Sequence, residues 1–438
     1  CKCPSPVRLV LTLHGVPFKV SPPNKIRIED LRDPVLTDIQ KAGLAHGENN
    51  PVDLSVDAVE AAAVARTGLE DFGDDGYRER LALWLSEVDE DPERTAIGRF
   101  GLYNDCVRYA ANRLLVNDLL ARHPEIHEIE IARPIIVVGL PRSGTTHLVN
   151  LIAADQRLRS MPLWEGQEPV PNPKDDAPKD GIDPRWARSE AAWQGMKTGS
   201  PLIASMHPMN PDHIHEELEL QLHDFTSYNQ EWIARVPRWR DYYLAHDQTP
   251  HYARLKTMLK VLTWYRPRDR WILKCPQHLE QLGPLMTTFP DATIVVTHRD
   301  PVSVIQSAIT MLTYGARMNY KTPRPEFYLE YWTDRIKRLL EASVRDRHLL
   351  PEGRTVDVLF HELMSDDMGT VERIYEVAGL EMTNEARAQI ARYVAEHPRG
   401  KDGQVVYDLR KDFLVEPSEV RAGFDFYLAR FEIRKEVK

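Results

Sequence analysis

A loop between an expected strand and an expected helix carries the residues whose types and spacing most clearly allow chemistry. Gly139 and Gly144 have the G-x-x-x-x-G spacing of a phosphate-binding loop, and Thr145 and Thr146 follow as hydroxyl donors. Backbone N–H groups at the start of a helix converge on an anion, aided by the positive end of the helix dipole. The loop therefore predicts a site for a phosphate or a similar anion.

The positive charges around this loop differ from those of a nucleotide P-loop. Thr145 stands where the Walker lysine would follow the second glycine, and the cation is Arg142, inside the loop. No apolar strand ends in the aspartate that usually helps to hold Mg²⁺. The strand candidate ending at Thr297 continues instead into His298 and Arg299. This pattern indicates a cation-rich site for a group transfer that needs no metal ion.

Two motifs together carry a resemblance to a known family. Residues 141–146 read Pro-Arg-Ser-Gly-Thr-Thr, and residues 298–307 read His-Arg-Asp-Pro-Val-Ser-Val-Ile-Gln-Ser. In this order the pair resembles the signature of sulfotransferases that use 3′-phosphoadenosine 5′-phosphosulfate (PAPS), above all the bacterial branch with this loop. The resemblance covers roughly residues 134–403. It implies transfer of a sulfonate group from PAPS to a hydroxyl or amine.

The resemblance also implies which residues bind the two ends of the nucleotide. Arg142 would be the cation on the transferring group, and Arg299 with Ser307 would bind the 3′-phosphate. A later loop, residues 397–403, resembles the segment that closes on this phosphate, and Phe360 stands where the family often has an aromatic near the adenine. The implied cofactor-binding residues are Arg142, Ser143, Gly144, Thr145, Thr146, Arg299, Ser307, Arg399, Gly400 and Lys401.

Lys274 ends a second apolar strand, where a lysine is costly unless it faces an anion. The resemblance implies that Lys274 reaches the bridging oxygen or the sulfonate. The general base stays open, because Pro276 stands where many eukaryotic members have a histidine. Other branches have a glutamate shortly after the first helix, so Glu165 is the first candidate, with Glu168 and His278 as alternatives. The predicted catalytic residues are Glu165, Arg142, Lys274 and His278.

Strands and helices alternate from Pro134 onward, as expected for a parallel sheet with helices on both faces. The run at 135–139 is apolar and β-branched, which is typical of a central strand buried on both sides. The sequence predicts an α/β fold with a P-loop-like parallel sheet flanked by helices. The expected strands are 135–139, 271–274, 292–297 and 355–360, and the expected helices are 251–264, 278–288, 301–312, 325–348 and 368–378.

Two other stretches differ from this alternating pattern. Residues 1–50 show little periodicity and are expected to be irregular, whereas 57–69, 77–88 and 95–122 have helical spacing and predict an N-terminal helical layer. Residues 165–250 are rich in Pro, Trp and His and predict an insertion over the ligand cleft. We expect two parts, residues 1–130 with the lead-in and helical layer, and residues 131–438 with the sulfotransferase-like α/β domain.

Composition narrows the partners of this 438-residue chain. Its net charge of −10 argues against a nucleic-acid partner, and its apolar runs are too short for an integral membrane segment. Four scattered cysteines, Cys1, Cys3, Cys106 and Cys275, predict no disulfide framework and favour a reducing cytoplasm. The sequence does not determine the oligomeric state, and a homo-oligomer is one of the states that it allows.

Three function hypotheses remain after these exclusions. The first is a PAPS-dependent sulfotransferase acting on a small or partly apolar acceptor, because the 165–250 insertion is rich in aromatic residues. The others are a P-loop kinase or NTPase, and an inactive nucleotide-binding module of the same fold. His213, His215 and His223 with nearby glutamates allow a metal hypothesis, but no H-E-x-x-H motif is present and no metal is predicted.

Overall fold

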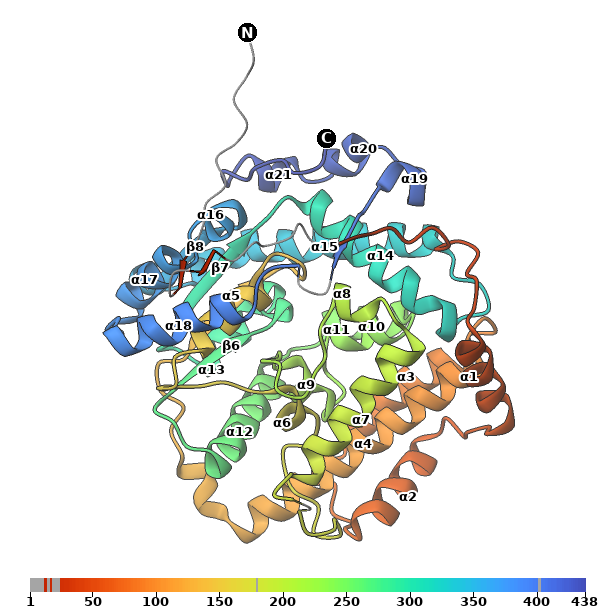
Figure 1. Ribbon diagram of the computed structural model, residues 1–438. Coiled ribbons are helices and arrows are strands. Elements are labelled where there is room, and N and C mark those ends of the chain that lie inside the picture. Colours follow the sequence, from red (N-terminus) through yellow and green to blue (C-terminus); the bar gives the residue numbers. More distant parts are fainter. Residues whose placement is uncertain (1–11, 14–15, 18–23, 179, 401–402) are drawn as a thin grey trace.

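A five-stranded parallel sheet forms the centre of the computed structural model (Figure 1). The structure describes residues 12–13, 16–17, 24–178, 180–400 and 403–438; Cys1, Cys3 and Lys401 lie outside them. The strand order is β5 (Leu158–Arg159), β6 (Arg270–Lys274), β4 (Ile135–Gly139), β7 (Thr293–His298) and β8 (Thr355–Leu359).

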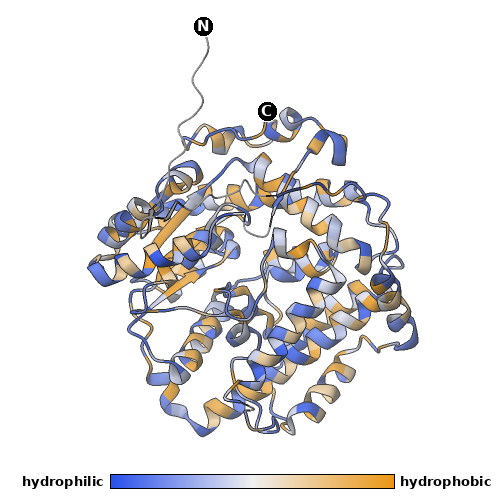
Figure 2. Ribbon diagram, in the orientation of Figure 1, coloured by the Kyte–Doolittle hydropathy of each residue, from blue (hydrophilic) through white to orange (hydrophobic). Residues whose placement is uncertain are grey.

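Every residue of β4, β6 and β7 is buried, which explains their nearly unbroken apolar sequences. The four predicted strands are confirmed to within one residue at each end. The sequence pattern did not predict β5, because two residues carry no recognisable periodicity. Figure 2 shows the strands as the most apolar part of the sheet layer.

Alternate residues of each strand pack against different helices. Ile136, Val138 and Ile294 belong to one core cluster with α12–α15, whereas Ile135 and Val137 belong to another with α5, α17 and α18. The sheet is therefore covered on both faces, as predicted. The bounds are α5 Thr145–Ala153, α12 Thr249–Tyr265, α13 Leu282–Thr288, α14 Pro301–Asn319, α15 Pro325–Asp346, α17 Asp367–Ala378 and α18 Asn384–Glu396.

Two predicted helices have different bounds in the structure. The helix expected at 278–288 is divided into a 3₁₀ turn, η2 (Pro276–Glu280), and α13. The helix expected to end at residue 312 continues to Asn319, because its later residues Thr313, Tyr314 and Ala316 are buried as well.

The N-terminal layer consists of α1 (Asp38–Asn49), α2 (Val56–Thr67), α3 (Tyr77–Asp89) and α4 (Ala96–Arg122). The expectation that residues 1–50 are irregular is wrong for α1. This helix buries only Gln40 and Gly47, so its apolar periodicity is weak, but a capping box joins Thr37 and Gln40. The middle of α4 packs with α2 and α3, and its last turns (Leu115, Val116, Leu119) join the core of the sheet.

The insertion consists of short helices joined by irregular segments. In Figure 1 it lies between the sheet and the N-terminal layer, and its α7 and α11 pack on α1 and α3 respectively. Its helices are α6 Leu163–Gln167, α7 Pro184–Gly199, α8 Ile203–Met206, α9 Leu218–Leu222, α10 Asn229–Ile233 and α11 Pro237–Ala245.

The remaining elements lie around this frame. The short strand β9 (Gln404–Val405) pairs in parallel with β3 (Lys25–Ile26), and α16 (Phe360–Ser365) follows β8 directly. Across the described ranges, no helix is long and apolar enough to cross a membrane. The others are β1 Thr12–Leu13, β2 Val16–Pro17, η1 Pro124–Glu128, η3 Arg347–Leu349, η4 Glu352–Arg354, α19 Leu409–Phe413, α20 Pro417–Ala422 and α21 Asp425–Leu428.

Gly139, the last residue of β4, tests how tightly the loop packs on the sheet. A Cβ there would lie 1.9 Å from Oγ1 of Thr297, so we expect Gly139→Ala to lower the free energy of unfolding by about 2 kcal/mol. Gly101→Ala in α4 is the matched control, because no atom lies within 4 Å of its added Cβ. Urea unfolding measures both, and equal stabilities of the two variants would contradict the tight packing.

Candidate active site

The loop of residues 139–144 turns the chain from β4 into α5 through two left-handed residues. Arg142 has φ 65° and Gly144 has φ 85°. A non-glycine residue in this region costs of order 1 kcal/mol and is most often found at functional sites. No side chain caps the start of α5, so the N–H groups of its first turn are available to an anion.

Ser143 stabilises the loop from inside. Its hydroxyl donates to the carbonyl oxygen of Leu140 at 2.6 Å and lies 2.8 Å from Oγ1 of Thr297. Its backbone N–H also points to the Leu140 oxygen, at 3.3 Å, and the residue is fully buried. Both donors of Ser143 are directed into the loop, and its contact with a phosphate stays a prediction.

Lys274, at the end of β6, faces an anion supplied by the chain itself. The side chain is 1% exposed, and its Nζ donates to Oγ1 of Thr146 at 3.3 Å and to the carboxylate of Glu216. Its backbone N–H donates to Glu217 at 2.9 Å. The anion expected beside this buried lysine is the carboxylate of Glu216. No sequence motif marked Glu216 as catalytic.

The two sequence motifs meet at the carboxyl ends of β4 and β7. Nε of Arg142 donates to Oγ of Ser307 at 2.9 Å, and one of its NH groups donates to the carbonyl oxygen of Met206 at 2.5 Å. The guanidinium of Arg299 donates to the carbonyl oxygen of Arg142 at 2.5 Å. The structure thus brings Arg142, Arg299 and Ser307 together, as the paired motifs predict.

Phe360 covers the same region from the end of β8. Its ring lies under the guanidinium of Arg299, with 3.8 Å between the ring centre and Cζ. A Cβ added to Gly144 would approach this ring to 3.0 Å, so the glycine permits the close contact between loop and ring. An aromatic wall therefore stands beside the cationic site.

Arg399, in the described part of the 397–403 segment, has its partners outside the Arg142, Arg299 and Ser307 cluster. Arg399 donates to the carbonyl oxygen of Met364 and to Nε2 of His147, both at 2.9 Å, and pairs with Asp367. Gly400 adopts φ 76°. Among the described residues, no hydrogen bond joins Arg399 or Gly400 to Arg299 or Ser307. Closure of this loop on the same anion stays a prediction, and Lys401 is outside the described residues.

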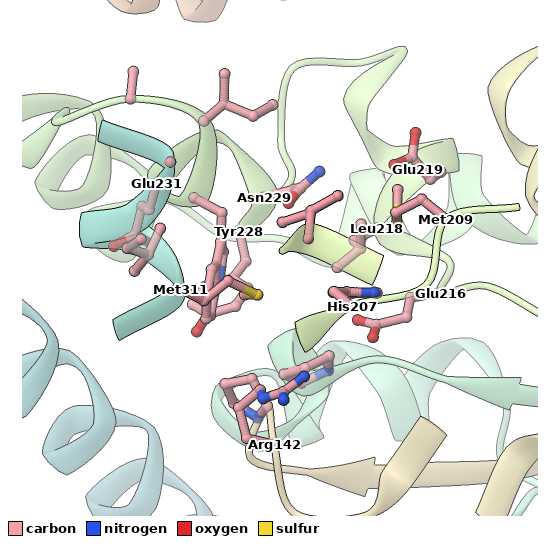
Figure 3. A pocket seen from close by; sticks show the side chains of 18 of the residues that line it. Arg142, His207, Met209, Glu216, Leu218, Glu219, Tyr228, Asn229, Glu231 and Met311 are labelled. Atoms are coloured by element: carbon pink, nitrogen blue, oxygen red, sulfur yellow. The ribbon is translucent and has the colours of Figure 1, made fainter. Parts of the chain in front are cut away.

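A cavity of about 360 Å³ opens beside the loop, largely under the insertion (Figure 3). Arg142, Thr145 and Thr146 border one end, and Figure 3 shows His207 and Glu216 facing that end. The other wall is mainly apolar. It includes Met196, Ile203, Met209, Leu218, Trp232, Met311, Leu312, Tyr320 and Tyr328.

Three histidines lie at the charged end of this cavity or next to it. The ring centres of His207, His213 and His215 are 6.0–6.3 Å apart. Burial, together with the neighbouring histidines and Lys274, lowers the pKa of His213 to about 3 and that of His207 well below its ordinary value. Both imidazoles are therefore neutral at pH 7. Within the described ranges, no cluster of His, Cys, Asp and Glu suits a metal ion.

None of the three predicted general bases borders this cavity. Glu165 accepts hydrogen bonds from Arg159 at 2.7 Å and from Arg266 at 3.0 Å, in a separate hollow. Glu168 pairs with Arg188 and Arg66. His278 is buried, with Nδ1 2.8 Å from the hydroxyl of Tyr252. The structure places these three residues away from the cavity, and Glu216 is the carboxylate in contact with Lys274. The identity of the general base stays a prediction.

The ion pairs of Glu165 predict a structural effect without a catalytic one. Glu165→Gln leaves the fully buried Arg159 without its charged partner, so the free energy of unfolding should fall by about 3 kcal/mol. Turnover at a temperature where the variant is folded should stay within about threefold. A loss of turnover without a loss of stability would restore Glu165 as the base.

Comparisons with known proteins agree on one family. A model described as "Sulfotransferase family" matches residues 134–384. The omega-hydroxy-beta-dihydromenaquinone-9 sulfotransferase Stf3 of Mycobacterium bovis is 24% identical over 288 residues, which cover 60% of this chain and 67% of the relative. The Mycobacterium tuberculosis protein of the same name matches equally.

Two crystal structures share the whole architecture. Sulfotransferase STF1 from Mycobacterium tuberculosis superposes with a TM-score of 0.75 at 28% identity, covering 85% of this chain and 98% of the other. Sulfotransferase STF9 from Mycobacterium avium superposes with a TM-score of 0.78 at 26% identity, covering 88% and 99%. The fold is therefore shared over most of this chain.

Proposed function

Since the chain belongs to the sulfotransferase family, we propose that it transfers a sulfonate group from PAPS to the hydroxyl of an apolar acceptor. The observation that carries the proposal is the contact between the two motifs. Arg299 donates to the backbone of Arg142, and Arg142 donates to Ser307. One nucleotide can therefore bridge the loop and the start of α14.

The residues present suit a bisphosphate-containing donor. The uncapped first turn of α5 and the hydroxyl of Thr146 would hold the 5′-phosphate, and Arg299 and Ser307 the 3′-phosphate. PAPS supplies the sulfonate and a bisphosphate leaving group. The aromatic ring of Phe360 beside Arg299 offers an apolar surface for the base.

Chemistry at this site requires positive charge on the leaving group and a proton acceptor. The acceptor oxygen forms a bond to sulfur while the bond between sulfur and the 5′-phosphate oxygen breaks. Arg142 and Lys274 would stabilise the charge that develops on this oxygen. Glu216 would take the proton of the acceptor hydroxyl. Its present partner, Lys274, would turn from Glu216 to the leaving oxygen when the nucleotide binds.

Two other glutamates border the cavity but have different partners. Glu231 is held by two hydrogen bonds from Nε of Arg335, at 2.9 and 3.0 Å, and by the hydroxyl of Tyr331. Glu219 lies 3.5 Å from Nε2 of His215. Only Glu216, of the three, contacts a residue of the predicted catalytic group. This contact is the reason to favour it as the base.

The acceptor class follows from the cavity wall. Methionine, leucine, isoleucine and aromatic side chains dominate it, so an apolar body fits better than a sugar or a charged group. Its volume of about 360 Å³ is near the lower end of ligand pockets, so a long acceptor would insert only its hydroxyl-bearing end. The Stf3 relative is named for an omega-hydroxylated menaquinone, an acceptor of this kind.

The cellular setting proposed is the reducing cytoplasm. The two cysteines within the described ranges, Cys106 and Cys275, are buried free thiols. Burial raises the pKa of each thiol well above its ordinary value, so both are poor nucleophiles.

Ligand-dependent stability separates the proposed function from a kinase or NTPase. Adenosine 3′,5′-bisphosphate at about 100 times its Kd should stabilise the fold by about 2.7 kcal/mol. ADP with Mg²⁺ should stabilise it much less, and Arg299→Ala should abolish the difference. Thermal unfolding measures the stabilisation, and sulfonated product from long-chain alcohols would exclude an inactive module. Stabilisation by ADP with Mg²⁺ alone would refute the proposal.

Glu216→Gln isolates the proton transfer. The variant keeps the shape of the side chain but loses the basic oxygen, so kcat should fall by about 10²–10⁴-fold. The Kd of adenosine 3′,5′-bisphosphate should change less than threefold. The matched control is Glu219→Gln, which removes the same charge three residues later, in α9, and should retain most of kcat. If Glu216→Gln keeps kcat and His207→Gln loses it, His207 is the base instead.

A further inference from the structure

Arg299 already holds an anion from within the chain. Its Nε donates to one carboxylate oxygen of Glu436 at 2.8 Å, and its NH2 group donates to the other at 2.7 Å. The hydroxyl of Ser303 donates to the same carboxylate at 3.3 Å. This is the two-point geometry in which arginine binds carboxylate and phosphate most strongly.

The segment that carries Glu436, residues 429–438, is anchored on consecutive residues of the second motif. The ring of Phe431 stacks on His298, with 4.0 Å between ring centres. One oxygen of Asp300 accepts the backbone N–H of Glu436 at 2.9 Å and a guanidinium N–H of Arg421 at 3.0 Å. These contacts fix the backbone of the segment and direct the Glu436 side chain towards Arg299.

The Nε–NH2 edge of the Arg299 guanidinium, which would bind a phosphate in the same two-point geometry, already carries Glu436. The NH1 group of Arg299 donates to the carbonyl oxygen of Arg142, while Nε and NH2 are taken by Glu436. A 3′-phosphate bound to the same edge needs the positions that the carboxylate oxygens occupy. The carboxylate and the phosphate therefore exclude each other on this edge of the guanidinium.

We propose that Glu436 is an internal competitor of the 3′-phosphate, so that nucleotide binding requires its release from Arg299. The proposal rests on the proposed function, because it takes Arg299 as the 3′-phosphate site. A phosphate dianion carries more charge than a carboxylate and forms more hydrogen bonds, so it can displace Glu436. The exchange sets the apparent affinity of the nucleotide.

The size of the effect follows from the fraction of molecules whose Arg299 is free. The apparent Kd equals the intrinsic Kd divided by this fraction. The pair of Glu436 and Arg299 is charge-assisted, reachable by solvent and held in place by its segment. We expect the paired state to be favoured over the free state by about tenfold, or about 1.4 kcal/mol. Removal of the charge on Glu436 should raise the apparent affinity of any ligand that binds Arg299 by the same factor.

The test compares Glu436→Gln with the wild-type chain in calorimetric titrations with two nucleotides. Glu436→Gln should bind adenosine 3′,5′-bisphosphate about tenfold more tightly. Its affinity for adenosine 5′-monophosphate, which lacks the 3′-phosphate, should change less than twofold. The control is Glu432→Gln, which removes the same charge from the same segment, at an exposed position, and should change neither affinity.

Each outcome has a separate meaning. Unchanged or weaker bisphosphate binding by Glu436→Gln would overturn the proposal that Glu436 competes with the 3′-phosphate. It would leave the proposed sulfotransferase function intact. In an Arg299→Ala background, Glu436→Gln should have no further effect, and a persistent tenfold gain would overturn the role of Arg299 in the competition. A wild-type chain that binds ADP with Mg²⁺ but not the bisphosphate would refute the proposed function, and the competitor with it.

Discussion

The contact between the ends of β4 and β7 is the constraint on which the site depends. These strands are hydrogen-bonded neighbours in a parallel sheet, so their carboxyl ends meet at one edge. The first strand continues into the loop with Arg142, and the second into Arg299 and α14. Two cationic motifs far apart in the chain are thereby joined by a direct hydrogen bond.

Charge compensation within the chain is the second general feature. Lys274 pairs with Glu216, Arg142 is bonded to Ser307 and the backbone of Met206, and Arg299 pairs with Glu436. Each cation of the proposed donor site therefore has a partner that an incoming phosphate or sulfonate would replace. Buried or partly buried charges without partners would be costly, so Lys274 and Arg299 are held in ion pairs, and Arg142 is hydrogen-bonded to neutral oxygen atoms.

The insertion shows why local sequence did not reveal the partners of Glu165 and Glu168. Glu165 stands beside a tryptophan at the position expected from other branches, but Arg266, 101 residues later, folds onto it. Its contacts and those of Glu168 belong to ion pairs that hold the insertion together. Glu216 instead comes from an irregular segment between α8 and α9, where neither periodicity nor motif spacing marks a catalytic residue. The reason to propose it as the base is its contact with Lys274, which the sequence does not reveal.

What the sequence determined by itself was the sheet, most of its helices and the phosphate loop, because these depend on local patterns: apolar β-branched runs, helical spacing and glycine positions. The pairing of Arg142, Arg299 and Ser307 could also be anticipated, since parallel strands place their ends together. Only the tertiary structure decided that Ser143 faces inward, that Glu165 is paired away from the cavity, and that Glu436 lies on Arg299. Each of these depends on a partner distant in sequence. Contacts between such distant side chains produce no periodicity or motif spacing in the local sequence.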